Sequence, residues 1–426
     1  MKIKLVKHFR ALSLVLLVPA IVLAQTSAPV RSAANPTLDA KRLERLTGQF
    51  DSYVRNKQLA GGVIMVAHKG KIAYRHTFGM RDVESSSRLP ENAIFRIASQ
   101  TKALISVGIM ILQEEGRLLI SDPASKYIPE FANTTVAIAK DGGGYDVVKA
   151  KRQVTIRDLL THTSGFGYGT GLAKDKWEAA KITGWYFADR DEPVRATVAR
   201  MAALPADAQP GEKYVYGYST DILGAIIEVA SGQDLDVFLQ DRILDPLRMT
   251  DTHFYLPLSK VQRLATVYSA RPNAGGIGRT PDDGTTVSQG HYVKGPRKSF
   301  SGGAGLLSTA NDYMRFLLMM RNGGHLDGTR ILSRKSVELM TVDHLGSIPY
   351  TAGSGFGLGF SVKKDLGLRG ELGAVGEYGW GGAYHSTYWV DPKEDLVVVY
   401  FTQLIPAGGL DDHAKLRALI YQSIVN

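Results

Sequence analysis

The segment 95–104 constrains this chain most, because an extended apolar run passes there directly into a long apolar helix with a serine at the junction. The run Ala-Ile-Phe-Arg-Ile-Ala precedes Ser99, and apolar residues follow it at helical spacing as far as Gly116. We therefore predict a strand that leads into a helix. The helix is expected to start at Ser99 and to end just before Gly116.

Ser99 and Lys102 occupy positions i and i+3 of this predicted helix, so their side chains share one face. The Lys102 ammonium can then hydrogen-bond the Ser99 hydroxyl. Free N–H groups and the dipole at the helix N-terminus favour negative charge beside Ser99, as an attacking alkoxide or an acyl oxyanion requires. A plain N-cap serine followed by a solvated lysine fits the same pattern. A second Ser-x-x-Lys, from Ser361 to Lys364, falls in a predicted strand with its side chains on opposite faces, and we interpret it as coincidence.

Residues 1–24 are predicted to be a secretory signal peptide. Four cations accompany an apolar run from Ala11 to Ala24, and Val22 and Ala24 suit positions −3 and −1 of a cleavage site. The run contains Pro19 and is shorter than the roughly 20 residues that a membrane span needs. We therefore expect a periplasmic or secreted protein with no stable membrane anchor after cleavage.

Composition narrows the functional classes. The chain has no cysteine, so a disulfide framework and a lipoprotein anchor are both excluded. The formal charge of +10 belongs partly to the leader, and no basic stripe with interleaved aromatic residues predicts a nucleic-acid partner. No metal-ligand spacing surrounds His162, and the zinc-peptidase and α/β-hydrolase motifs do not occur. We expect neither a metal nor another cofactor.

The two ends of the chain predict one antiparallel sheet with flanking helices. Apolar residues at helical spacing predict a first helix, and Lys69-Gly70 predicts a two-residue hairpin turn between two strands. Near the other end, apolar runs alternate around an Asp391-Pro392 turn. The expected elements are a helix over about 38–57, strands over 61–68, 71–78, 384–390 and 395–401, and a last helix from about Asp411.

The middle of the chain has a different sequence pattern from the two ends. Thr155 is a predicted N-cap, and tyrosine and tryptophan residues cluster over 166–186, most of them expected in the core. The stretch 270–303 is long, polar and glycine-rich, which is typical of loops that are functional or disordered. We therefore expect a region of turns and short helices inserted between the two parts of the sheet.

Two further segments make the Ser99 and Lys102 pair specific. The first is Tyr-Val-Tyr-Gly-Tyr over 214–218, followed by Asp221, and the second is Gly-Trp-Gly-Gly-Ala over 379–383. Together with Ser-Gln-Thr-Lys, they resemble the three motifs of the penicillin-recognising serine hydrolases in the expected order. The chain most resembles the class C β-lactamase branch and, within it, the family VIII carboxylesterases.

The resemblance implies an α+β fold of the β-lactamase/transpeptidase type. Its antiparallel sheet is flanked by helices, and an all-helical domain is inserted so that the active site lies between the two. We therefore expect a flexible lead-in over 25–37 and one catalytic domain over 38–426. The α/β part is expected at about 38–120 and 300–426, and the mostly helical insertion at about 121–299.

The resemblance also implies catalytic roles. Ser99 matches the nucleophile, Lys102 its partner, and Tyr216 the tyrosine of the family's Tyr-x-Asn motif. A neighbouring ammonium favours phenolate, so Tyr216 can take the Ser99 proton and later activate water. Tyr214 and Tyr218 compete for this role. We choose Tyr216 because its spacing to Asp221 matches the esterase pattern.

The oxyanion hole is expected to consist of the backbone N–H groups of Ser99 and Ala383, each worth roughly 3 kcal/mol in the transition state. Two glycines before Ala383 would let a substrate lie close to that strand, although a strand bulge would explain them as well. The expected substrate-binding residues are Gln100, Tyr218, Trp380, Gly381 and Gly382.

Departures from the β-lactamase motifs decide the predicted substrate. Trp380 and two glycines replace Lys-Thr-Gly, and Tyr218 replaces the asparagine of Tyr-x-Asn. Trp380 supplies no charge for a β-lactam carboxylate, whereas a neutral ester needs none. We predict a carboxylesterase that acts on short-chain esters, with weak β-lactam hydrolysis. A class C-type β-lactamase, a D-Ala-D-Ala-type peptidase acting on amides, and a penicillin-binding sensor without turnover remain alternatives.

Overall fold

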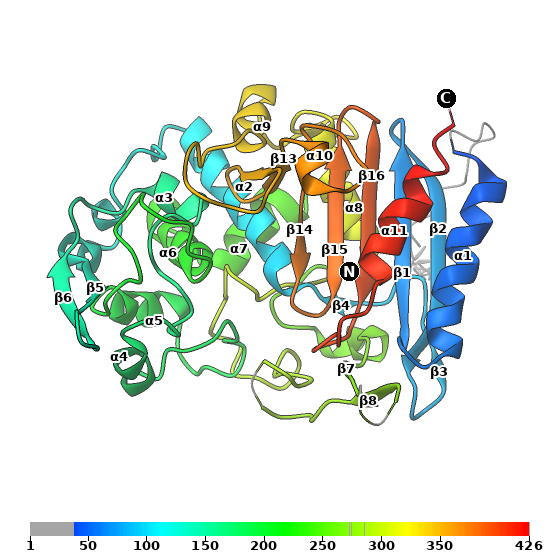
Figure 1. Cartoon of the computed structure of the whole chain (residues 1–426), viewed down its shortest axis with the longest axis horizontal. Helices are drawn as coiled ribbons and strands as arrows, with labels where there is room; N and C mark the ends of the chain where they lie inside the picture. The colour runs from blue at the N-terminus through cyan, green and yellow to red at the C-terminus, as the bar shows by residue number, and fades with distance from the viewer. Residues whose placement is uncertain (1–37, 272, 274, 285, 426) are drawn as a thin grey trace, which may run out of the picture.

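An eight-stranded antiparallel sheet forms the centre of the computed structural model, which describes residues 38–271, 273, 275–284 and 286–425 (Figure 1). The predicted signal peptide over 1–24 and lead-in over 25–37 lie outside these residues. From one edge to the other, the strands are β12 (Ser354–Phe356), β13 (Ser361–Lys363), β14 (Tyr378–Gly382), β15 (Ser386–Asp391), β16 (Leu396–Thr402), β1 (Gly61–His68), β2 (Lys71–Asp82) and β3 (Ser87–Arg88).

The sheet combines both ends of the chain, because β16 pairs with β1 at its centre. Both strands are buried along their whole length, which explains their nearly continuous apolar sequence. Val63 and Met65 belong to the hydrophobic core on one face, while Ile64 and Val66 belong to a second core on the other. A sheet covered on both sides is therefore encoded in these strands.

Helices cover both faces of this sheet (Figure 1). α1 (Ala40–Arg55) and α11 (Asp412–Tyr421) pack against each other on one face, and α2 (Thr101–Glu114) and α8 (Ala310–Arg321) lie on the other. The predicted first and last helices are confirmed, with Asp39 capping α1. The predicted hairpin is also confirmed, since Lys69 and Gly70 both have positive φ, as a type I′ turn requires.

The inserted region lies beside the β14 end of the sheet (Figure 1), and short helices joined by long irregular segments are its main regular elements. Its helices are α3 (Ile156–Leu160), α4 (Lys174–Ala179), α5 (Val194–Met201), α6 (Ser219–Ser231) and α7 (Leu235–Leu239), continued by the π-helix η4 (Gln240–Leu244). The expectation of an all-helical insertion is wrong in one respect. β5 (Thr135–Ala139) pairs with β6 (Tyr145–Lys149), and β7 (Tyr268–Ala270) pairs with β8 (Ile277–Arg279).

Shorter elements complete the chain. Thr155 caps α3 in a capping box with Asp158, as predicted from its sequence position. Among the described residues, no helix is long and apolar enough to cross a membrane. The remaining elements are β4 (Phe95–Arg96), β9 (Leu307–Ser308), β10 (His325–Leu326), β11 (Thr329–Arg330), α9 (Arg334–Met340), α10 (Leu366–Arg369), η1 (Ala98–Gln100), η2 (Ala124–Lys126), η3 (Pro129–Asn133) and η5 (Leu258–Arg263).

Candidate active site

Ser99 lies in a sharp turn between β4 and α2. The helix begins one residue earlier than predicted, as the 3₁₀ turn η1, and becomes α-helical at Thr101. Ala98 has φ of 42°, a left-handed conformation that is rare for a residue with a side chain and that often accompanies functional sites. Ala98 and Gln100 are buried, whereas Ser99 is half-buried. Of these three neighbouring residues, only Ser99 is therefore accessible to a substrate.

Lys102 is almost completely buried one turn further along. Its ammonium donates three hydrogen bonds: to the Gly303 carbonyl at 2.7 Å, the Ser99 hydroxyl at 3.2 Å and the Tyr168 hydroxyl at 3.3 Å. It also lies 4.7 Å from the centre of the Tyr216 ring. Because a lysine ammonium has three N–H donors, all of them are used, and its position is fixed.

A buried carboxylate supports Lys102 from behind. Asp221, in the first turn of α6, accepts hydrogen bonds from the Ser301 hydroxyl at 2.6 Å and the Gly303 N–H at 3.0 Å. Burial raises the pKa of Asp221, while Ser301 and the charge of Lys102 act in the opposite direction. Gly303 must be glycine, because a Cβ there would lie 2.3 Å from the other carboxylate oxygen. Asp221 therefore fixes the position of the loop over 301–303, whose Gly303 carbonyl accepts a hydrogen bond from Lys102.

Tyr216 lies across from this pair, shortly before α6. Its hydroxyl accepts a hydrogen bond from the Trp380 indole N–H at 3.2 Å, and its ring packs 4.7 Å from the His162 ring. His162 is fully buried, and burial followed by the charge of Lys102 lowers its pKa well below its usual range. His162 is thus a neutral packing residue that supports the tyrosine, in line with its predicted structural role.

The other tyrosines of this cluster are placed differently. The Tyr218 ring is buried between Trp177 and Phe187, and its hydroxyl donates to the Gly184 carbonyl at 2.7 Å. The Tyr214 ring packs against Tyr350. Burial raises the pKa of both Tyr214 and Tyr218, which disfavours a phenolate at either position. Tyr218 therefore lies in a packing position rather than in the predicted substrate contact.

Tyr168, which belongs to the aromatic cluster over 166–186, is a site residue that the sequence does not predict. It receives a hydrogen bond from Lys102, and its ring meets the Tyr216 ring edge-on at 5.7 Å. Burial, followed by interactions with Tyr216, raises the pKa of Tyr168 well above its usual range. It remains protonated at neutral pH and acts as a hydrogen-bonding partner rather than as a base. No sequence motif marks it, because its proximity to Lys102 depends on the folding of the inserted region.

The outer edge of β14 faces this site. β13 pairs only with Tyr378 and Gly379, so the strand from Trp380 onward lacks a β13 partner. The pairing of β14 with β15 has no register shift, which excludes the strand bulge. A Cβ at Gly382 would lie 2.5 Å from the Ile97 carbonyl, so this glycine brings the strand against the Ser99 turn.

The remaining predicted residues divide into two groups. Ala383 lies in the turn after β14 rather than on the strand, half-buried in a cluster with Ala98. Gly381 lies on the unpaired edge and is half-buried. Gln100 is fully buried, and its amide donates to the Ser386 hydroxyl at 3.0 Å. Gln100 therefore ties the Ser99 turn to β15 instead of facing a substrate.

The half-buried serine, the buried lysine that bonds it and the facing tyrosine define a serine hydrolase site on a β-lactamase/transpeptidase-like fold. A family model described as Beta-lactamase matches residues 46–422, and the chain belongs to this family. Esterase EstB from Burkholderia gladioli is 31% identical over 392 residues, which cover 87% of this chain and 93% of that protein.

Two further comparisons agree with this assignment. The ML-236A carboxylate methylbutanoyltransferase mlcH of Penicillium citrinum is 26% identical, with 86% of this chain and 90% of that protein covered. The solved structure of unliganded simvastatin synthase LovD from Aspergillus terreus superposes with a TM-score of 0.76 at 24% identity, covering 90% of this chain and 98% of that chain. This last likeness bears on the fold alone.

Proposed function

We propose that this protein is a secreted carboxylesterase that hydrolyses short-chain acyl esters through an acyl-enzyme on Ser99. Hydrolysis of β-lactams is a weak side activity. Trp380 carries the choice of substrate, because an uncharged indole stands at the third motif and bonds the Tyr216 hydroxyl at 3.2 Å. A neutral ester loses no binding energy at this position, whereas a β-lactam carboxylate has no cation there with which to pair.

The proposed reaction has two halves. Tyr216, whose phenolate form the Lys102 ammonium favours, accepts the Ser99 proton as the serine oxygen attacks the ester carbonyl, and the N–H groups of Ser99 and Ala383 stabilise the tetrahedral oxyanion. The proton passes to the departing alcohol, which leaves the acyl group on Ser99. Water then gives a proton to Tyr216 as its oxygen attacks the acyl carbonyl, and this proton returns to the Ser99 oxygen as the acyl–serine bond breaks and the acid leaves.

A substrate panel tests this proposal. We expect p-nitrophenyl esters of short acids to be turned over continuously, a chromogenic cephalosporin to react far more slowly, and a D-Ala-D-Ala peptide to be cleaved least. A single burst of product without turnover would support the penicillin-binding sensor instead. Faster turnover of the cephalosporin or the peptide than of every ester would replace the esterase by a β-lactamase or a peptidase.

Two variants tie the activity to the site. Ser99→Ala should abolish turnover and leave the circular dichroism spectrum and melting temperature nearly unchanged, because it removes one half-buried hydroxyl. Lys102→Ala should lose about 10²–10⁴-fold in rate, as removal of acid–base groups typically does. Because these residues act as one unit, the double variant should be no worse than Ser99→Ala.

Acyl transfer to an alcohol is a second candidate function, which the name of the Penicillium citrinum relative favours. The acyl-enzyme would be the same, and an alcohol would replace water in the second half. Hydrolysis of p-nitrophenyl butyrate in the presence of a small alcohol measures the partition between acid and new ester. Formation of acid alone would exclude this candidate.

Secretion is proposed from the sequence of residues 1–24. Expression of the full chain in a bacterium, followed by N-terminal sequencing of the periplasmic protein, should find cleavage after Ala24. Uncleaved protein in the cytoplasm would contradict the proposal.

A further inference from the structure

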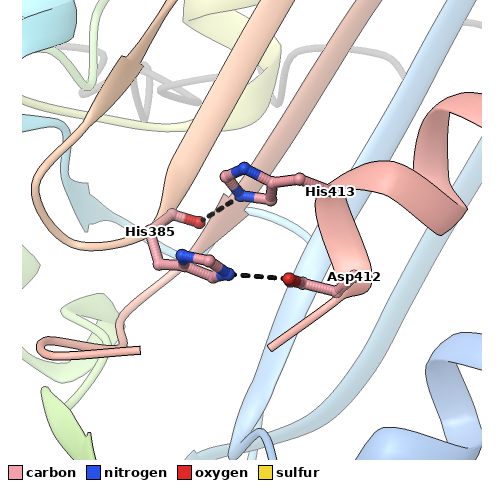
Figure 2. A group of neighbouring side chains, drawn as sticks. All are labelled: His385, Asp412 and His413. Carbon is pink, nitrogen blue, oxygen red and sulfur yellow. Dashed lines mark hydrogen bonds and ion pairs between the residues drawn. The ribbon is translucent and has the colours of Figure 1, made fainter. Parts of the chain in front are cut away.

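A cluster of two histidines and one aspartate lies outside the catalytic group, where the turn between β14 and β15 meets the start of α11 (Figure 2). His385 belongs to the turn, two residues after Ala383, and has φ of 65°. Asp412 and His413 are the first residues of α11. Figure 2 shows the two imidazole rings lying one above the other, with the carboxylate beside the lower one.

The three side chains are held close together. His385 Nε2 is 2.7 Å from one oxygen of Asp412, and the Tyr400 hydroxyl donates to the other oxygen at 2.7 Å. His413 Nε2 lies 3.2 Å from the His385 carbonyl oxygen. The two imidazole rings stack with centroids 4.1 Å apart. Tyr400 thus orients the carboxylate from behind, as a supporting hydrogen bond does around a metal ligand.

The charge of this cluster is incompletely compensated. Asp412 is fully buried, and among the described residues its only ion-pairing partner is His385. The nearby Lys415 pairs with Asp411 instead. His413 donates from Nε2 to the His385 carbonyl oxygen, which leaves the lone pair of its Nδ1 free. A buried carboxylate beside two imidazoles attracts a cation that accepts nitrogen as well as oxygen donors.

The donor atoms are near the spacing that such a cation needs. One donor atom from each residue can be chosen so that all three lie within 4.8 Å of one another. Zinc–nitrogen and zinc–oxygen bonds of about 2.0–2.2 Å place tetrahedral donors roughly 3.3 Å apart. Both histidines are half-buried, so rotation of their rings can close the difference, at the cost of the contact between His413 and the His385 carbonyl.

We propose that His385, Asp412 and His413 bind one divalent transition-metal ion of the zinc type, with water in the fourth position. The ion takes the place of the direct contact between His385 Nε2 and the Asp412 carboxylate. Because His385 lies in the turn that carries Ala383, the bound ion fastens this turn to α11. Binding itself does not depend on the proposed esterase function.

Calorimetric titration of the full-length protein, first freed of metal with EDTA, with ZnCl₂ tests the site. We expect one ion per chain, and a Co²⁺ complex with the visible absorption of tetrahedral coordination. His385→Ala and His413→Ala should each weaken binding at least tenfold. His325→Ala, which removes an exposed histidine on β10, should leave it unchanged. A rise in melting temperature with ZnCl₂ should appear in the wild type and in His325→Ala but not in His385→Ala or His413→Ala.

Two controls keep the outcome clear. Ser99→Ala should bind Zn²⁺ like the wild type while lacking esterase activity, so failure of the esterase proposal does not affect this test. His413→Ala removes only a stacked, half-buried ring, so it offers a folded variant if His385→Ala disturbs the turn. Absence of one-to-one binding, or equal binding by both histidine variants and the wild type, would overturn the proposal.

Discussion

At the scale of single residues, the site consists of one half-buried hydroxyl surrounded by hydrogen-bonded and buried groups. Lys102 donates its three hydrogen bonds to Ser99, Tyr168 and Gly303. The Gly303 N–H in turn is bound by Asp221. The carboxyl group that interacts with the ammonium therefore lies behind the Gly303 loop rather than beside Ser99. This leaves the face of Ser99 free for a neutral substrate.

Substitution of Asp221 tests this indirect support. Asp221→Asn keeps an oxygen for Ser301 and Gly303 but removes the negative charge, so we expect kcat to fall about tenfold with KM nearly unchanged. Asp221→Ala also releases the loop and should cost at least a further tenfold. A loss of folded protein with an unchanged kcat of the enzyme that still folds would reduce Asp221 to a purely structural residue.

The tyrosines offer matched substitutions. Tyr216→Phe removes the hydroxyl proposed to carry the proton and should lower kcat by about 10²–10⁴-fold. Tyr218→Phe removes a buried hydroxyl bonded to Gly184, so it should cost about 1 kcal/mol of stability and leave most of the rate. Tyr214→Phe should likewise only alter the rate. Steady-state kinetics and thermal melts separate these effects, and an active Tyr216→Phe beside an inactive Tyr168→Phe would transfer the role to Tyr168.

At the scale of elements, α6 begins beside the candidate active site and extends from there into the inserted region. Asp221 lies in its first turn, and Glu228 lies near its end, where the carboxylate accepts the N–H of Leu235 at 3.3 Å. Burial raises the pKa of Glu228 to about 7, with a smaller opposing effect of the Leu235 N–H. The helix thus contains a carboxylate that is costly to ionise in the folded protein.

This cost predicts how stability varies with pH. Between its ordinary pKa and about 7, Glu228 binds more protons in the folded than in the unfolded chain, so its contribution to stability falls as pH rises through this window. Glu228→Gln should therefore raise the free energy of unfolding at pH 8 by about 1–3 kcal/mol and change it little at pH 4. Urea denaturation at both pH values measures this.

A control with the opposite sign lies on α9. Glu338 is exposed, and its hydrogen bond with Lys335 followed by that with Arg334 lowers its pKa, so its contribution is present above its ordinary pKa and lost in acid. Glu338→Gln should not stabilise the protein at pH 8. Equal stabilisation by both substitutions would indicate a general charge effect instead.

The elements also show which features of the fold and site can be predicted from the sequence alone. The Lys69-Gly70 hairpin, the Thr155 cap and the end of α2 before Gly116 follow local rules, so they were predictable to within a residue or two. The left-handed Ala98 and the burial of Gln100 were not, because packing against distant segments causes both. For the same reason, motif spacing located Ser99, Lys102 and Tyr216 but neither the contact of Tyr168 nor the packing role of Tyr218.

At the scale of the whole molecule, the proposed catalytic residues come from two structural units. Ser99, Lys102 and Trp380 belong to the sheet and its helices, whereas Tyr168 and Tyr216 belong to the inserted region. The hydrogen bond from Trp380 to Tyr216 crosses this boundary, and the Trp380 ring also packs 5.3 Å from Phe356. Trp380 thus affects both the substrate surface and the position of the proposed base.

The choice between esters and β-lactams is tested at this boundary. If a cation at the third motif holds a β-lactam carboxylate, its absence should cost about 1–3 kcal/mol, or roughly 5- to 150-fold in kcat/KM, whereas neutral esters lose nothing. Trp380→Lys should therefore raise the ratio of cephalosporin to ester turnover even though total activity falls with the loss of indole packing and of the bond to Tyr216.

Trp380→Met separates these two effects, because it removes the indole without adding a charge. We expect both substrates to suffer in similar proportion in Trp380→Met, since the loss of packing displaces Tyr216 for either reaction. Only the lysine variant should change the ratio, and added salt should diminish that change because it screens the new charge. Measurement of kcat/KM for p-nitrophenyl butyrate and a chromogenic cephalosporin on all three proteins provides the comparison. A ratio that is equal in the lysine and methionine variants would show that charge at position 380 does not select the substrate.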